Sequence, residues 1–310
     1  MKNFKKIVAL FFSMTLIITA FVGCKDSKQN IISETSKKDS YNNDYFVNIE
    51  WVAKNANNEN VVIIDGRDNK KYEKGHIPGA INVAWQSLAN IKGKAGDKNW
   101  GVALPKEELS QKLGELGIDK KSQVVVYADK DGWGEDGRIV WELKTAGINA
   151  KMLDGGFDLW SKENKEITTE VPVIISKKLE IEEIDSKTTI TTEDLRNNMD
   201  KYTIVDSRAK DEYEGATKFG EAKGGHIKGA ISIPFNEVYN EDGTIKSKEE
   251  LLKIFESKGL KKDKEIVTYC TAGIRSAHEA LILNMLGFKA KNYDASFYEW
   301  ATTYPDLIVK

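Results

Sequence analysis

The chain has 310 residues, of which 40% are apolar and 30% charged; this composition is globular, and the length exceeds one domain of roughly 100 to 200 residues. The 46 Lys and Arg residues against 48 Asp and Glu residues give a formal net charge of −2, so no positive excess favours a nucleic acid as a partner. The only two cysteines, Cys24 and Cys270, exclude a disulfide scaffold, and each thiol needs its own explanation.

Residues 1–24 have the pattern of an export signal. Three lysines precede an apolar run over 7–22, which is shorter than the ~20 residues that span a bilayer. The run ends at Gly-Cys24 and resembles a bacterial lipobox, in which the signal is cut before the cysteine and the thiol is lipidated. We expect a lipoprotein signal peptide, a flexible tether over 25–44, and a folded part that lies outside the cytoplasmic membrane and is lipid-anchored to it. A plain secretory signal and an uncleaved anchor are the alternatives.

The rest of the chain is an internal repeat. Residues 61–83 align with 202–233, with a nine-residue insertion before the histidine of the second copy. The matched pairs are Asp65/Asp206, Arg67/Arg208, Tyr72/Tyr213, His76/His226 and Gly79/Gly229, and Arg138 roughly matches Arg275. We therefore expect a first domain over 45–165, a linker over 166–184 and a second domain over 185–310.

Each copy alternates short β-branched runs with helical periodicity. Examples of the runs are 61–64 and 123–127 in the first copy and 266–269 in the second. This alternation predicts an α/β fold: two tandem domains, each a parallel β-sheet flanked by helices on both faces, with functional groups at the carboxyl ends of the strands.

Cys270 follows one of these apolar runs directly. A short loop containing Gly273 leads to an amphipathic helix that we expect to begin near Ser276. Backbone N–H groups in such a loop form an anion nest, and the helix N-terminus adds partial positive charge. Both favour a thiolate, so we expect Cys270 to be a nucleophile and Arg275 to hold an incoming anion. A buried structural cysteine and a surface arginine are the alternatives.

Several motifs together resemble those of the rhodanese family of sulfurtransferases, in particular its tandem two-domain thiosulfate sulfurtransferases. They are 76–80 and 226–230, 153–157 and 293–297, and the loop 270–276. The resemblance implies ping-pong chemistry, in which the Cys270 thiolate takes sulfane sulfur from thiosulfate and passes it to cyanide or a thiol acceptor. It implies no metal and no organic cofactor.

The resemblance also implies a set of site residues. Cys270 and Arg275 are expected to be catalytic. The expected substrate-binding residues are Thr271, Ala272, Gly273, Ile274, Ser276 and Arg208. A 3-mercaptopyruvate sulfurtransferase and a persulfide-carrying or sensing module remain alternatives. A phosphatase or arsenate reductase is disfavoured, because those relatives have five residues between Cys and Arg, whereas four separate Cys270 from Arg275 here.

The first copy has Ala128 at the position of the cysteine and is therefore expected to be inactive. Its longer loop places Trp133 and Arg138 either toward the substrate or in solvent. Glu212 stands where some relatives have a substrate-binding arginine, and it would repel an anionic donor if it pointed into the site. His278 is expected to be a partly exposed helix residue.

The residues that occur in both copies favour structural roles. The Asp65 and Arg67 pair repeats Asp206 and Arg208, and the two paired histidines are expected to stabilise turns.

Overall fold

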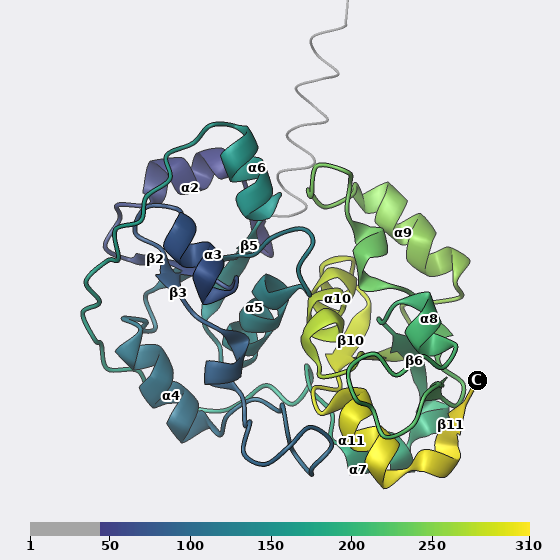
Figure 1. Cartoon of the computed structure of the whole chain (residues 1–310). Coiled ribbons are helices and arrows are strands. Elements are labelled where there is room, and N and C mark those ends of the chain that lie inside the picture. The colour runs from purple at the N-terminus through teal and green to yellow at the C-terminus, as the bar shows by residue number, and fades with distance from the viewer. Residues whose placement is uncertain (1–43) are drawn as a thin grey trace, which may run out of the picture. The chain divides into compact units, whose positions relative to one another are not determined.

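The computed structural model describes residues 44–310, so the expected signal peptide and Cys24 lie outside the described residues. Two α/β repeats follow each other in this part of the chain (Figure 1). Within residues 44–310, no helix is long and apolar enough to cross a membrane.

The first repeat is built on a five-stranded parallel sheet with the order β1-β5-β4-β2-β3. The strands are β1 (Phe46–Val47), β2 (Val61–Asp65), β3 (Ile81–Asn82), β4 (Gln123–Tyr127) and β5 (Asn149–Leu153). The helices are α2 (Ile49–Asn55), α3 (Asn69–Lys74), α4 (Lys106–Glu115), α5 (Glu135–Thr145), α6 (Gly156–Lys162) and the 3₁₀ turn η1 (Trp85–Leu88).

The second repeat has a four-stranded parallel sheet with the order β10-β9-β6-β8 and a short antiparallel pair, β11-β7. The strands are β6 (Tyr202–Asp206), β7 (His226–Ile227), β8 (Ile231–Ser232), β9 (Glu265–Tyr269), β10 (Lys289–Asn292) and β11 (Ile308–Val309). The helices are α7 (Thr192–Asn197), α8 (Lys210–Tyr213), α9 (Lys248–Ser257), α10 (Ile274–Met285), α11 (Ser296–Thr303) and the 3₁₀ turns η2 (Met199–Lys201), η3 (Phe235–Val238) and η4 (Pro305–Leu307).

The central strands form because their residues can be buried on both faces of the sheet. Val124, Val125 and Val126 of β4 have no exposed surface, and neither do Ile266 and Val267 of β9. Continuous β-branched runs of this kind are typical of parallel sheets covered by helices on both sides. The predicted fold class is therefore confirmed.

The two repeats meet along helices α5 and α10, which lie side by side in the centre of Figure 1. Gly137 allows this close approach, because a Cβ atom there would lie 2.4 Å from the Cβ of His278. An aspartate in each of the matching motifs 153–157 and 293–297 also links the two repeats. Asp154 accepts a hydrogen bond from the backbone N–H of Ile245 at 2.7 Å, and Asp294 accepts one from Ala103 at 3.0 Å.

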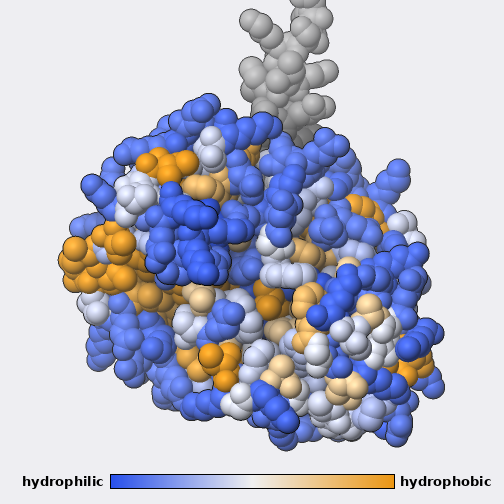
Figure 2. Space-filling view, in the orientation of Figure 1, coloured by the Kyte–Doolittle hydropathy of each residue, from blue (hydrophilic) through white to orange (hydrophobic). Residues whose placement is uncertain are grey.

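The segment between the repeats has no helix or strand from residue 163 to residue 191. It nevertheless exposes several apolar side chains: Ile167, Val171, Val173, Ile174 and Ile175. Figure 2 shows a mostly hydrophilic face with an apolar patch on the side of the first repeat.

Candidate active site

Cys270 lies at the carboxyl end of β9, in the centre of the second sheet. Gly273 then turns the chain with a left-handed φ of 78°, and α10 begins at Ile274. The helix therefore starts two residues earlier than expected, so Arg275 and Ser276 belong to its first turn rather than to the loop. This places the free N–H groups of a twelve-residue helix next to the sulfur atom.

The pKa of the Cys270 thiol is lowered from its ordinary value of 9.0. Burial raises it, since the residue is only 1% exposed, but the positive charge of Arg275 and the backbone N–H groups of Ser276 and Ala272 lower it by more in total. The Ser276 hydroxyl has a single proton and donates it to Asn292 Oδ1 at 2.7 Å, so we assign the effect to the guanidinium and the backbone. The site thus favours a thiolate.

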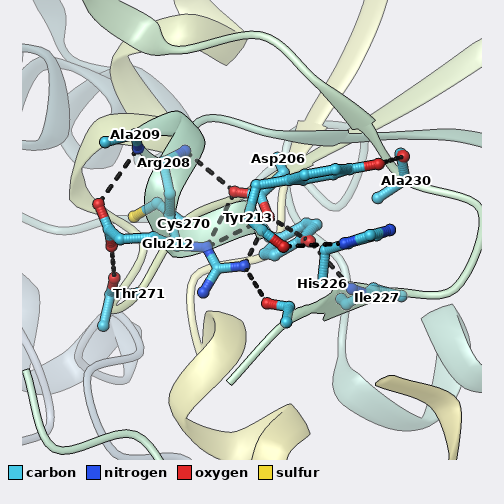
Figure 3. A network of polar contacts seen from close by, with 12 residues as sticks. Asp206, Arg208, Ala209, Glu212, Tyr213, His226, Ile227, Ala230, Cys270 and Thr271 are labelled. Atoms are coloured by element: carbon cyan, nitrogen blue, oxygen red, sulfur yellow. Dashed lines mark hydrogen bonds and ion pairs between the residues drawn. The ribbon is translucent and has the colours of Figure 1, made fainter. Parts of the chain in front are cut away.

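Arg275 is held by Glu212, which comes from α8. Its Nη1 and Nη2 atoms donate to the two carboxylate oxygens at 2.6 and 2.9 Å, and Nη2 also donates to the Thr271 hydroxyl at 2.7 Å. Burial opposes ionisation of Glu212, but the contact with Arg275 prevails and lowers the pKa of the carboxyl group. Glu212 is therefore a carboxylate that neutralises the guanidinium of Arg275. Figure 3 shows the same carboxylate accepting hydrogen bonds from the Thr271 hydroxyl and from the N–H of Ala209, each at 3.1 Å.

The start of α11 fixes the backbone of the cysteine loop. Ser296, which has a left-handed φ of 58°, accepts a hydrogen bond from the N–H of Cys270 at 2.9 Å. The N–H groups of Phe297 and Tyr298 donate to the carbonyl oxygens of Cys270 and Thr271, both at 3.1 Å. The motif 293–297 and the residue after it thus hold the backbone of the loop 270–276.

A pocket of about 190 Å³ opens over the nucleophile. Of the predicted site residues, Cys270, Thr271, Ala272, Ile274 and Arg275 line it. Gly273 and Ser276 are not in its lining, and they act through the backbone turn and through the N–H group next to the sulfur.

The structure does not bring Arg208 to this pocket. Its side chain has no exposed surface and forms an ion pair with Asp206 at 2.6 Å, donates to the carbonyl oxygen of Gly225 at 2.7 Å, and stacks on Phe297. The first copy repeats this arrangement with Arg67 and Asp65. A substrate-binding role for Arg208 therefore has no support in the geometry, and the expected structural role fits both copies.

The first repeat contributes to the site through its longer loop. Trp133 lines the pocket, and its ring centroid lies 4.9 Å from the Arg275 guanidinium carbon. Arg138 is fully buried instead and donates to the carbonyl oxygens of Gly273 and Gly101 at 3.3 and 3.0 Å. Gly134 and Gly273 are the N-cap residues of α5 and α10 and therefore correspond to each other. This correspondence matches Arg275 with Asp136, so the rough match of Arg275 with Arg138 was wrong.

The three histidines lie outside the pocket. His76 and His226 each stack on the preceding tyrosine, with ring centroids 3.7 and 3.6 Å apart, and each Nδ1 lies 2.9 Å from that tyrosine's carbonyl oxygen. This geometry fits the expected turn-stabilising role. The prediction for His278 was wrong: it has no exposed surface, and burial lowers its pKa to about 3 because α5 covers it.

The aromatic walls of the pocket were missed by sequence reasoning. Trp85, Trp100, Phe219 and Tyr298 line it together with Trp133. Phe219 belongs to the nine-residue insertion of the second copy, and that insertion was the available signal. A larger cavity, of about 570 Å³, is lined by residues of both repeats, including Trp141 and Lys289, but its lining contains no cysteine.

No cluster of His, Cys, Asp or Glu side chains suited to a metal ion occurs among residues 44–310. The candidate site contains one thiol. Cys270 is free and buried, with a guanidinium and helix N–H groups beside it. Such a thiolate can attack an electrophilic sulfur atom and hold the product as a persulfide.

Residues 48–163 and 191–303 each match the rhodanese-like domain family. The chain belongs to the rhodanese family. It is 32% identical over 270 residues to "Sulfur carrier protein TtuD" of Thermus thermophilus, covering 82% of this chain and 92% of the relative. It is 30% identical to a "Putative thiosulfate sulfurtransferase" of Saccharopolyspora erythraea, covering 83% and 92%.

Two solved structures have the same fold over most of this chain. SseA of Escherichia coli, a 3-mercaptopyruvate sulfotransferase, is 25% identical, with a TM-score of 0.68 over 81% of this chain and 97% of that one. Tum1 of Saccharomyces cerevisiae is 19% identical, with a TM-score of 0.75 over 86% and 98%, and shows the fold alone. Family and relatives together support sulfurtransferase activity for this tandem rhodanese.

Proposed function

We propose that this rhodanese transfers sulfane sulfur from thiosulfate through a persulfide on Cys270 to cyanide or a thiol acceptor. The observation that carries the proposal is the position of a single thiol, with a lowered pKa, beside Arg275 at the N-terminus of α10. The Cys270 sulfur is the nucleophile in the first half-reaction and the leaving group in the second. The proposed transfer therefore uses no second nucleophilic side chain.

In the first half-reaction the Cys270 thiolate attacks the outer sulfur of thiosulfate. A Cys–S bond to that sulfur forms, the S–S bond of thiosulfate breaks, and sulfite leaves with the electron pair. Arg275 and the N–H groups of Ala272 and Ser276 stabilise the negative charge of the attacking thiolate and then that of the terminal persulfide sulfur.

In the second half-reaction the acceptor attacks the terminal sulfur of the persulfide. With cyanide, a C–S bond forms, the Cys270 S–S bond breaks, and thiocyanate leaves while the thiolate is restored. Burial of Cys270 in an apolar pocket limits competing attack by water and oxidants on the intermediate.

Two alternatives share the same persulfide. A 3-mercaptopyruvate donor is favoured by the structural likeness to SseA, and a sulfur-carrying role with little turnover is favoured by the likeness to the protein named TtuD. Thiosulfate is preferred here because the sequence of the cysteine loop resembles that of bacterial thiosulfate enzymes.

The test is sulfur uptake by the purified full-length chain. After reduction and exposure to thiosulfate, intact mass should show one added sulfur atom that is absent in Cys270→Ser, and added cyanide should release thiocyanate over many turnovers. A stable persulfide without turnover would indicate the carrier, and uptake from 3-mercaptopyruvate alone would indicate that donor. Normal turnover by Cys270→Ser would overturn all three.

We also propose that lipidation of Cys24 anchors the chain to the cytoplasmic membrane, with the folded part outside that membrane. The lipobox-like segment supports this. Metabolic labelling with an alkyne fatty acid should label the chain in membranes, and Cys24→Ala should abolish the label. Release of an unlabelled, shortened chain from wild-type cells would indicate a plain secretory signal instead.

A further inference from the structure

Five aromatic side chains surround Cys270, and both repeats supply them. Trp85, Trp100 and Trp133 come from the first repeat, and Phe219 and Tyr298 come from the second. They form edge-to-face contacts: Trp100 with Tyr298 at 5.6 Å between ring centroids, and Trp133 with Phe219 at 5.2 Å. Such walls offer a large rigid apolar surface and suit a planar apolar group.

Near the site, each copy has one insertion relative to the other, and each insertion contains one of these aromatic residues. Ala128 and its capping Gly134 are six positions apart, whereas Cys270 and Gly273 are three apart, and the longer loop carries Trp133. The nine-residue insertion of the second copy carries Phe219. Trp133 is 46% exposed and Phe219 39%, so the pair stands at the mouth and is accessible to a ligand.

The pocket presents little free charge to a ligand. Arg275 is the only charged residue in its lining, and its guanidinium is bound through two contacts to Glu212, which is itself buried. Trp133 covers the outer face of the same guanidinium. Lys218, which is close enough to feel the charge of Arg275, is paired with Asp211.

We propose that the sulfur donor this site fits is an organic sulfane compound with an aromatic body and a single negative charge, with thiosulfate a slower substrate. The inference rests on the proposed sulfur transfer and refines its donor. A dianion meets a neutral Arg275–Glu212 pair and a thiolate, so it gains less than it would from a free arginine. An aromatic body gains contact with Trp133 and Phe219 that sulfite oxygens cannot make.

Benzenethiosulfonate is a donor of this class, and its reaction balances without a co-reactant. The Cys270 thiolate attacks its terminal sulfur, the Cys–S bond forms, the donor S–S bond breaks, and benzenesulfinate leaves with the electron pair. Methanethiosulfonate reacts in the same way with the same charge but lacks the ring. The two compounds therefore separate the effect of the ring from the effect of charge.

The test compares kcat/KM of the full-length chain for benzenethiosulfonate, methanethiosulfonate and thiosulfate, with cyanide as acceptor. Each value is divided by the donor's rate with free cysteine, which removes differences in leaving group. We expect benzenethiosulfonate to exceed methanethiosulfonate by about tenfold or more. Trp133→Ala should bring this ratio close to one, whereas Trp133→Phe should keep most of it.

Glu212→Gln tests the charge argument separately. It should raise kcat/KM for thiosulfate relative to methanethiosulfonate, about tenfold. A ring preference that is absent, or unchanged in Trp133→Ala, would overturn the aromatic part, and an unchanged thiosulfate ratio in Glu212→Gln would overturn the charge part. In both cases sulfur would still reach Cys270. Failure of all three donors to add sulfur to Cys270 would instead overturn the proposed function.

Discussion

Glu212 binds the guanidinium of Arg275 through two contacts, at 2.6 and 2.9 Å, although the residues lie 63 positions apart in the chain. Helix α8 supplies the carboxylate and the first turn of α10 supplies the guanidinium. The pair holds Arg275 in place beside the cysteine loop. It also removes most of the free charge that an anionic substrate would meet.

Arg275 should control the ionisation of the nucleophile. Because its charge lowers the pKa of Cys270, the wild-type thiol should ionise below its ordinary value of 9.0, and sulfur uptake should rise with pH and level off before that value. Arg275→Gln should move this pH profile upward. The ultraviolet absorbance of the thiolate measures the shift without a reagent.

The matched control is the double variant Glu212→Gln/Arg275→Gln, which removes both charges. Its midpoint should lie between those of the wild type and Arg275→Gln, because the uncompensated Glu212 carboxylate no longer opposes the thiolate. Identical midpoints in all three proteins would mean that the backbone alone sets the pKa of Cys270.

The same pair should show strong coupling in stability. Removing one partner leaves a buried charge without a counterion, so Arg275→Gln is expected to lower the free energy of unfolding by about 3–5 kcal/mol. The double variant should lose less than the sum of the single variants in urea unfolding. The exposed pair Lys98–Glu193 is a control that should give additive losses. Additivity at both pairs would contradict the coupling.

The nucleophile could be predicted from sequence because its signal is local. Cys270 follows a β-branched strand and precedes Gly273 and an apolar helix, so strand, loop and helix are all readable within 265–285. The parallel sheets were predictable for the same reason, since each central strand is a continuous apolar run.

What the sequence did not reveal depends on packing between distant segments. Glu212 faces Arg275 because β6 and β9, which precede the two residues in the chain, are neighbours in the sheet. His278 is buried because Gly137 lets α5 approach. His278 has the sequence context of an ordinary polar helix position, and for Glu212 the sequence left open whether the carboxylate points into the site. Arg208 was misassigned because an arginine after a strand fits either an anion site or a buried pair with Asp206.

Glu279 should make stability depend on pH. Burial raises its pKa from 4.5 to about 8, against the hydrogen bond from Ser207, so the folded chain keeps a proton that the unfolded chain has lost between these values. Stability from this group is therefore present below 4.5 and is lost as pH rises, by about 1.4 kcal/mol per pH unit.

Between pH 4.5 and 8, the free energy of unfolding should fall less steeply with pH for Glu279→Gln than for the wild type. The slopes should differ by about 1.4 kcal/mol per pH unit, which corresponds to one proton. Burial also raises the pKa of Glu142 to about 8, but Glu142 is present in both proteins, so its effect cancels in the comparison. Equal slopes for the two proteins would mean that Glu279 is ionised in the folded chain.

Gly273 should resist substitution more than Gly287, which also has a left-handed backbone. A Cβ atom at this position would lie 2.4 Å from the carbonyl oxygen of Asp294 and 2.9 Å from Nη1 of Arg138. Gly287 has a similar φ of 84°, but a Cβ atom there would meet only Lys262 Nζ, at 3.9 Å. Gly287→Ala is therefore expected to cost about 1–2 kcal/mol in urea unfolding, the penalty of the backbone alone. Gly273→Ala should cost more and should also reduce sulfur uptake, because the displaced loop moves the N–H groups away from Cys270. Equal losses for the two variants would show that the loop can relax around the added methyl group.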